Sequence, residues 1–166
     1  MWCGVKKENV NRYMKIFITG VAGFLGSHLA DLMISQGHTV AGNDNMIGGY
    51  TDNVPQDVEF HQVDCCDLEN MTRAMEGCDI VYHTAATAYE GLSVFSPVLV
   101  TRNIFEASVT TITAAIRNKV KRIVYCSSMA RYGHHDVMPY KEDYECRPQD
   151  PYGIAKKAGE DVLRNL

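Results

Sequence analysis

The sequence predicts a single α/β domain, a doubly wound parallel sheet covered by helices on both faces in three αβα layers. Short apolar segments alternate with amphipathic helical segments along the chain, which is typical of βαβ units. A glycine-rich turn joins the first apolar segment to the first helical segment. With 166 residues and 46% hydrophobic content, the chain fills one core and is short for two.

Five buried strands are predicted from runs rich in β-branched and aromatic residues, several of them apolar on both faces. These strands are expected over residues 15–19, 38–42, 58–63, 79–84 and 121–127. Apolar residues at helical spacing predict helices over residues 27–36, 67–76, about 98–118 and 152–166. Because strands and helices alternate, the strands are expected to run parallel with right-handed crossovers.

The charge of the chain limits its partners. A formal net charge of −4 leaves no basic face for a nucleic-acid backbone, so no nucleic-acid partner is expected. No lysine or arginine stands between Lys15 and Arg73, whereas aspartate and glutamate recur there. We therefore expect a ligand of this stretch to be held without cationic side chains.

Cysteine spacing and the N-terminal segment indicate the compartment. The six cysteines form no C-x-x-C pair, which favours reduced thiols in a cytoplasmic protein. Residues 1–14 lack the apolar stretch of a signal peptide and are expected to be a flexible extension of a domain over residues 15–166. No apolar run reaches the length of a membrane span, so no membrane partner is expected.

Three glycines, Gly20, Gly23 and Gly26, follow the first predicted strand and open the first predicted helix. In this position glycine permits the tight turn, the close approach of backbone to a pyrophosphate and close helix packing. Backbone N–H groups at the helix start then hold phosphates without a cation. An ordinary strand-to-helix turn is the alternative, but the context favours a Rossmann-type dinucleotide site.

Two aspartates stand at the ends of the following strands. Asp44 ends the second strand, where a carboxylate accepts hydrogen bonds from the adenosine ribose hydroxyls and repels a 2'-phosphate. This position favours NAD over NADP. Asp64 follows the third strand, where it either contacts the adenine amino group or caps the next helix.

A serine, a tyrosine and a lysine form a candidate catalytic set. Ser128 ends the fifth strand, and Tyr152 and Lys156 lie at i and i+4 on one face of the last helix. A free tyrosine has a pKa of about 10, and a nearby cation lowers it by roughly 1 to 3 units. Tyr152 would then act as the base and Ser128 as a hydrogen-bond donor to the reacting oxygen. Such a pair is common on surface helices, but its combination with the glycine loop favours catalysis.

Other reactive groups give weaker signals. A His-His-Asp run at residues 134–136 lacks a partner cluster of suitable spacing, so no metal is predicted and these side chains are expected to be solvated. Cys65, Cys66 and Cys126 are expected to be small buried side chains, because no cation close in sequence would activate them as nucleophiles.

As a set, these motifs resemble the extended short-chain dehydrogenase/reductase superfamily, in particular its NAD-dependent nucleotide-sugar epimerase/dehydratase family with its UDP-glucose 4-epimerase-like enzymes. The matching segments are TGVAGFLGSHL at 19–29, NDN at 43–45, VD at 63–64, HTAA at 83–86, SS at 127–128 with YG at 132–133, and PYGIAK at 151–156. The resemblance covers nearly everything after Met14.

The resemblance implies a site for NAD. It places Phe24 and Leu25 at the pyrophosphate, Asp44 and Asn45 at the adenosine ribose, and Asp64 and Cys65 at adenine. It places Thr84, Ala85 and Ala86 along the cofactor, Asn103 on the helix after the fourth strand, and Ser128, Tyr152 and Lys156 at the reacting atoms, with Lys156 also bonded to the nicotinamide ribose. Residues 89–91 either face the sugar or form an ordinary loop.

The resemblance also implies an activity and partners. The similar epimerases oxidise a sugar hydroxyl to a ketone and return the hydride from the other face. Their substrates are UDP-, GDP- or dTDP-linked sugars, and relatives commonly form homodimers through two long helices.

Two departures from the family pattern matter. Met129 and Ala130 follow Ser128, where the 4,6-dehydratases have Asp-Glu, so an epimerase is preferred over a dehydratase or a dehydrogenase. The chain stops in the helix of Lys156 after five predicted strands, whereas a full doubly wound dinucleotide fold has six. We therefore expect an N-terminal portion without the C-terminal substrate domain, and a noncatalytic NAD-binding module is the remaining alternative.

Overall fold

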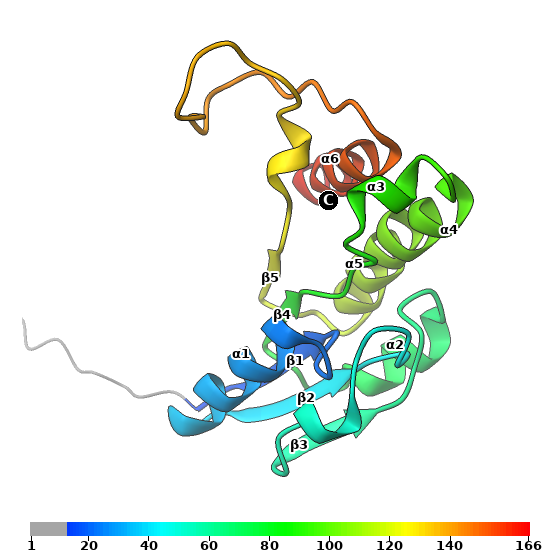
Figure 1. The fold of residues 1–166 in the computed structure, drawn as a ribbon. Helices are drawn as coiled ribbons and strands as arrows, with labels where there is room; N and C mark the ends of the chain where they lie inside the picture. Colours follow the sequence, from blue (N-terminus) through cyan, green and yellow to red (C-terminus); the bar gives the residue numbers. More distant parts are fainter. Residues whose placement is uncertain (1–12) are drawn as a thin grey trace, which may run out of the picture.

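A five-stranded parallel sheet forms the centre of the computed structural model, which describes residues 13–166 (Figure 1). The strands are β1 (Lys15–Thr19), β2 (Thr39–Asn43), β3 (Val58–His61), β4 (Ile80–His83) and β5 (Arg122–Tyr125). Their spatial order is β3-β2-β1-β4-β5. The winding direction changes between β1 and β4, where an open parallel sheet of this kind forms its ligand crevice. The predicted fold class is confirmed.

Helices cover both faces of the sheet. They are α1 (Phe24–Ser35), α2 (Leu68–Ala74), α3 (Glu90–Ser93), α4 (Pro97–Thr101), α5 (Ala107–Arg117) and α6 (Pro151–Arg164), with short 3-10 turns η1 (Thr51–Asn53) and η3 (Met129–Arg131). A π-helical turn, η2 (Arg102–Glu106), joins α4 directly to α5. No described helix is long and apolar enough to cross a membrane.

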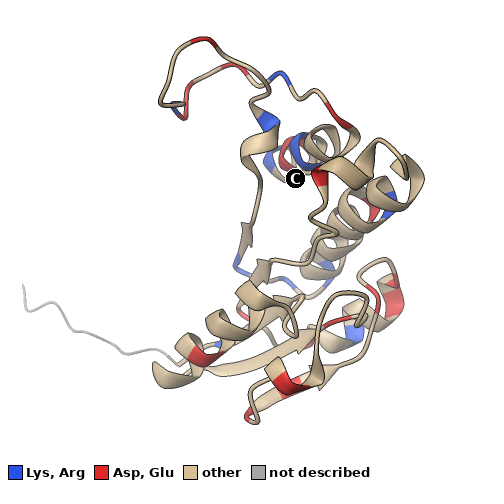
Figure 2. Ribbon diagram, in the orientation of Figure 1, with Lys and Arg blue, Asp and Glu red and all other residues tan. Residues whose placement is uncertain are grey.

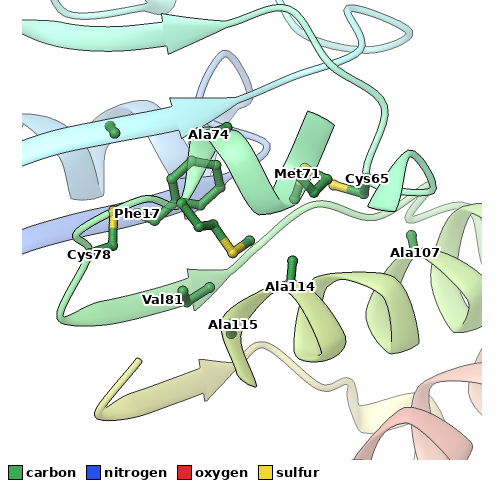
Figure 3. Packing of buried hydrophobic residues seen from close by; sticks show 11 residues of the cluster. Phe17, Cys65, Met71, Ala74, Cys78, Val81, Ala107, Ala114 and Ala115 are labelled. Carbon is green, nitrogen blue, oxygen red and sulfur yellow. The ribbon is translucent and has the colours of Figure 1, made fainter. Parts of the chain in front are cut away.

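Side chains of β1 alternate between the two faces of the sheet and anchor both layers of helices. Ile16 and Ile18 pack against α1, whereas Phe17 packs with Met71 of α2 and Ala114 of α5 (Figure 3). Full burial of each such side chain stabilises the fold by about 1.5–3 kcal/mol. Since both faces are covered, the carboxyl ends of the strands are held in fixed positions.

Most strand and helix ends lie one or a few residues from the predicted ones, and three differences have a clear physical reason. α1 begins at Phe24 rather than at residue 27, because Gly23 takes an extended backbone conformation and is itself the N-cap. The single helix expected over residues 98–118 contains the π-helical turn. Asp67, and not Asp64, caps α2 by accepting a hydrogen bond from the Asn70 N–H at 3.1 Å, so the N-cap interpretation of Asp64 is wrong. The extension expected over residues 1–14 lies, up to residue 12, outside the described residues.

Candidate active site

The turn between β1 and α1 requires glycine at two of its three positions. Gly20 has φ of +70°, and a Cβ on it would lie 2.9 Å from the Ala85 Cα. A Cβ on Gly26 would lie 2.1 Å from the Gly20 carbonyl oxygen. Both contacts are far shorter than real Cβ contacts, so the loop brings its backbone against β4 and packs α1 tightly on the turn.

The N-terminus of α1 offers backbone donors. Its first helical hydrogen bond runs from the Ser27 N–H to the Gly23 carbonyl oxygen at 3.0 Å, so the N–H groups of Phe24, Leu25 and Gly26 precede the helical pattern. No side chain caps this end. Because unpaired N–H groups and the helix dipole both favour an anion, the geometry suits a pyrophosphate.

Asp44 joins the glycine loop to the loop that follows β2. Its Oδ2 accepts from the Ala22 N–H at 3.1 Å, and its Oδ1 accepts from the Met46 N–H at 2.8 Å. Each carboxylate oxygen has a further lone pair for a ribose hydroxyl. From α1 to β3 the ribbon bears acidic residues and no basic ones (Figure 2).

Asp64 is held at both of its oxygens. Oδ1 accepts from the Cys66 N–H at 2.8 Å, and Oδ2 pairs with Nη1 of Arg102 at 3.1 Å. Burial acts to raise the pKa of Asp64, but the Cys66 N–H and the Arg102 guanidinium outweigh it and lower that pKa. The sequence prediction overlooked this cation, because Arg102 is 38 residues away along the chain.

A buried polar chain fixes the end of β4. Thr19 Oγ1 accepts from the N–H groups of Thr84 and Ala85, each at 3.1 Å, and lies 2.8 Å from Nδ1 of His83. His83 Nε2 lies 3.0 Å from the Ser108 hydroxyl. Burial lowers the pKa of His83 to about 3, so the imidazole is neutral at pH 7. These contacts hold the backbone that faces Gly20, and the HTAA motif at 83–86 does not reveal them.

A cavity of about 330 Å³ lies at this edge of the sheet. Every residue predicted to contact the cofactor lines it, except Tyr152 and Lys156. The lining also includes Asn43 of the NDN motif and Tyr89 of the segment weighed as sugar-facing, together with Ile47 and Gly49, which sequence reasoning did not select. The volume is within the usual range for small-molecule sites.

Cys65 lies in the cavity wall and is a small buried side chain, as the sequence predicts. Its Sγ accepts from Asn43 Nδ2 at 3.2 Å, and burial raises its pKa to about 11. Burial also raises the pKa of the neighbouring Cys66, to about 12. Both thiols therefore stay protonated at pH 7 and are poor nucleophiles.

The structure brings Tyr152 and Lys156 together inside the molecule. Lys156 is 3% exposed, and its Nζ donates to the Cys126 carbonyl oxygen at 2.8 Å and lies 6.0 Å from the centre of the Tyr152 ring. Burial lowers the pKa of Lys156 to about 8. The ammonium is thus anchored on the chain just after β5, with the tyrosine ring nearby.

The Ser128 side chain is hydrogen-bonded within its own turn rather than to Tyr152 or Lys156. Its Oγ accepts from the Ala130 N–H at 3.2 Å and caps η3. Within residues 13–166, no hydrogen bond joins it to Tyr152 or Lys156. Of the three predicted catalytic residues, only Tyr152 and Lys156 therefore lie against each other, and none of the three lines the cavity.

The buried carboxylate of Glu160, one helical turn beyond Lys156, connects α6 to the segment that follows β5. Glu160 of α6 accepts a hydrogen bond from the Ser127 hydroxyl and pairs with Nε of Arg131 at 3.2 Å. Because Ser127 precedes Ser128 and Arg131 ends η3, the contacts join the end of β5 to α6. Sequence reasoning missed Glu160, since its partners are distant in sequence.

The His-His-Asp run behaves only partly as predicted. His134 and Asp136 are exposed, but His135 packs on the rings of Tyr140 and Tyr144 with centroid distances of 5.6 and 5.1 Å. His135 is therefore half-buried between these rings, and the expectation of solvated side chains holds fully only for His134 and Asp136. In the part of the chain that the structure describes, no group of three or more His, Cys, Asp or Glu side chains is placed to hold a metal ion.

Known proteins resemble this chain in sequence. The model of the NAD dependent epimerase/dehydratase family matches residues 16–166. Probable UDP-arabinose 4-epimerase 3 of Arabidopsis thaliana is 33% identical over 159 residues, which are 89% of this chain and 39% of that protein. UDP-glucose 4-epimerase of Corynebacterium glutamicum is 32% identical over 143 residues, 86% of this chain and 44% of that protein.

Solved structures agree with the sequence matches. UDP-glucose 4-epimerase of Thermotoga maritima, solved with UDP-glucose, superposes with a TM-score of 0.88 at 32% identity, over 92% of this chain and 50% of that one. The complex of Thermus thermophilus UDP-glucose 4-epimerase with NAD gives 0.87 at 33% identity, again over 92% and 50%. The chain spans half the length of these structures and less than half of the curated relatives, and the family model matches nearly all of it. The chain belongs to the NAD dependent epimerase/dehydratase family.

Proposed function

We propose that this chain is the NAD-binding portion of a UDP-sugar 4-epimerase. The observation that carries the proposal is the cavity in which the N-terminus of α1, Asp44 and Asp64 meet, since it offers donors to a pyrophosphate and acceptors to a ribose and an amino group. The named relatives support the substrate class, because each is a 4-epimerase of a UDP-linked sugar.

The residues present fit NAD at each part of the molecule. The N–H groups of Phe24, Leu25 and Gly26 would hold the pyrophosphate. Asp44 would bind the adenosine ribose, and its charge would disfavour the 2'-phosphate of NADP. Thr84 and Ala85, whose N–H groups donate to the Thr19 hydroxyl, and the adjoining Ala86 would line the remainder of the cofactor.

The chemistry of the proposed reaction divides between cofactor and protein. Bound NAD would supply a reversible hydride acceptor. The phenolic oxygen of Tyr152 would take the proton from the sugar hydroxyl and return it, and the buried ammonium of Lys156 would stabilise the phenolate by its charge. The Ser128 hydroxyl would donate to the same sugar oxygen, since its O–H is not used when Oγ accepts from the Ala130 N–H.

Assembly and location complete the proposal. Large apolar side chains such as Phe95 and Val98 lie exposed near or on α4. We propose that this region and α6 form a homodimer contact, and that the protein is cytoplasmic, in keeping with the five free cysteines of the described residues.

Calorimetric titration with NAD and NADP tests the proposal first. We expect NAD to bind at least about tenfold more tightly than NADP, and Asp44→Ala to weaken NAD binding about tenfold or more through loss of ribose hydrogen bonds. UDP-sugars are then screened for reduction of bound NAD and for 4-epimer products. Failure to bind either dinucleotide would contradict the proposal, whereas NAD binding without turnover would favour the noncatalytic alternative.

A further inference from the structure

Arg102 contacts two residues of the cavity wall, although it does not line the cavity itself and no motif includes it. Its Nη1 is 3.1 Å from Asp64 Oδ2 and 3.1 Å from Asn103 Oδ1, and both of these partners line the cavity. Asn103 in turn donates from Nδ2 to the Thr87 hydroxyl at 3.0 Å. A continuous hydrogen-bonded row, Asp64 to Arg102 to Asn103 to Thr87, thus borders the end of the cavity at which Asp64 lies.

The helix that carries Arg102 departs at this residue from the regular α-helical hydrogen-bond pattern. Arg102 and Asn103 begin the π-helical turn between α4 and α5. π-Helical turns are rare and recur at functional sites, where they change the direction of side chains on a helix. Here the two consecutive side chains both reach partners at the cavity wall.

Arg102 helps to hold the Asp64 carboxylate in place and favours its ionised form. With the Cys66 N–H on Oδ1 and Arg102 on Oδ2, both carboxylate oxygens are held in place. The same two partners lower the pKa of Asp64 against the opposing effect of burial. An ionised carboxylate only accepts hydrogen bonds, so it attracts an amino group and repels a carbonyl oxygen.

We propose that Arg102 is a positioning residue that holds Asp64 as the acceptor for the exocyclic amino group of adenine, and thereby sets the preference for adenine over a purine with a carbonyl at that position. This inference rests on the proposed function, because it requires that the cavity bind a dinucleotide. It adds a determinant of base specificity that acts through Asp64.

The test compares NAD with deamino-NAD, in which a carbonyl oxygen replaces the adenine amino group. Dissociation constants of both are measured by calorimetry for the wild-type chain, Arg102→Met, Asp64→Asn and the double variant. Arg117→Met is the matched control, because Arg117 pairs with Glu69 at 2.8 Å, its side chain is 44% exposed like that of Arg102, and neither partner lines the cavity.

We expect Arg102→Met to weaken NAD binding by about 5- to 20-fold, the value of a partly exposed charged hydrogen bond, and deamino-NAD binding by less than about twofold. Asp64→Asn should bring the two dinucleotides close to equal affinity. Adding Arg102→Met to Asp64→Asn should then cause no further change in the ratio of NAD to deamino-NAD affinity, since Arg102 acts through Asp64. The control should keep the wild-type preference.

Three outcomes overturn the inference. If Arg102→Met weakens NAD and deamino-NAD equally, Arg102 acts only as a general positive charge. If Arg102→Met changes the affinity for neither NAD nor deamino-NAD, Arg102 has no role in binding. If the wild-type chain binds no dinucleotide, the proposed function fails together with the inference, whereas in the first two outcomes NAD still binds and only the inference fails.

Discussion

Replacing Gly26 by alanine has two opposing effects on the stability of the fold, and the structure shows which of them is larger. In an ordinary helix interior, alanine in place of glycine stabilises by about 1 kcal/mol. Here the new Cβ would lie 2.1 Å from the Gly20 carbonyl oxygen and 2.9 Å from the Val21 Cα, both of them backbone atoms that no rotamer change can move. Overpacking costs about 1–3 kcal/mol even where side chains can adjust, so the clash should win.

We therefore predict that Gly26→Ala lowers the free energy of unfolding by at least about 2 kcal/mol, or the melting temperature by about 4–8 °C for a chain of this size. NAD affinity should fall at least about tenfold in the remaining folded protein, because α1 must move away from the turn. Urea unfolding and calorimetry measure the two quantities.

Gly91→Ala is the matched control. Gly91 lies in α3, and a Cβ on it would meet nothing within 4 Å. This variant should leave the free energy of unfolding unchanged or raise it by up to about 1 kcal/mol, and it should keep the wild-type NAD affinity. A Gly26→Ala variant that matched it in both measurements would refute the packing argument for the glycine loop.

Three further predictions concern charged or titrating side chains. Burial holds the pKa of Lys156 at about 8, below its ordinary value of 10.5. Between these values the unfolded chain binds more protons, so wild-type stability should rise with pH by up to about 3 kcal/mol relative to Lys156→Met; a constant difference across that window would contradict this. Burial lowers the pKa of His83 to about 3 from 6.5. Wild-type stability should therefore fall as the pH drops below about 6.5, with a slope of up to about 1.4 kcal/mol per pH unit. Acid unfolding curves of His83→Asn should lack this slope. Glu160→Gln should lower the free energy of unfolding by about 2–4 kcal/mol in urea unfolding, because it leaves the half-buried Arg131 without its counter-charge. Asp161→Asn, which breaks only the more exposed pair with Lys157, should leave the urea unfolding curve unchanged.

The fold could be predicted from local patterns. Each strand of the sheet is a short apolar run whose period and composition suffice to identify it, and the alternation with helices determines the parallel arrangement. The boundaries could not be predicted as well, because they depend on single backbone conformations. The extended Gly23 starts α1 early, and the π-helical turn at Arg102–Glu106 leaves no mark in the hydrophobic pattern.

The candidate site could be predicted only where a motif is contiguous. The glycine loop, Asp44 and the Tyr152–Lys156 pair depend on spacing within one or two elements. Arg102 and Glu160 act through partners brought together by the sheet and its crossovers, and His83 belongs to a motif that does not reveal its hydrogen-bonding role. Such contacts have no signature in a single sequence, since any polar residue on a helix can equally face solvent.

We propose that backbone N–H groups at the start of α1, and no cationic side chain, hold the phosphates of NAD. Backbone amide NMR of the isotope-labelled chain during NAD titration tests it most directly. We predict that the largest shifts fall on the amides of Phe24, Leu25 and Gly26, with smaller ones near Asp44 and Ala85. NAD binding that leaves those three amides unshifted would show that the phosphates are held elsewhere.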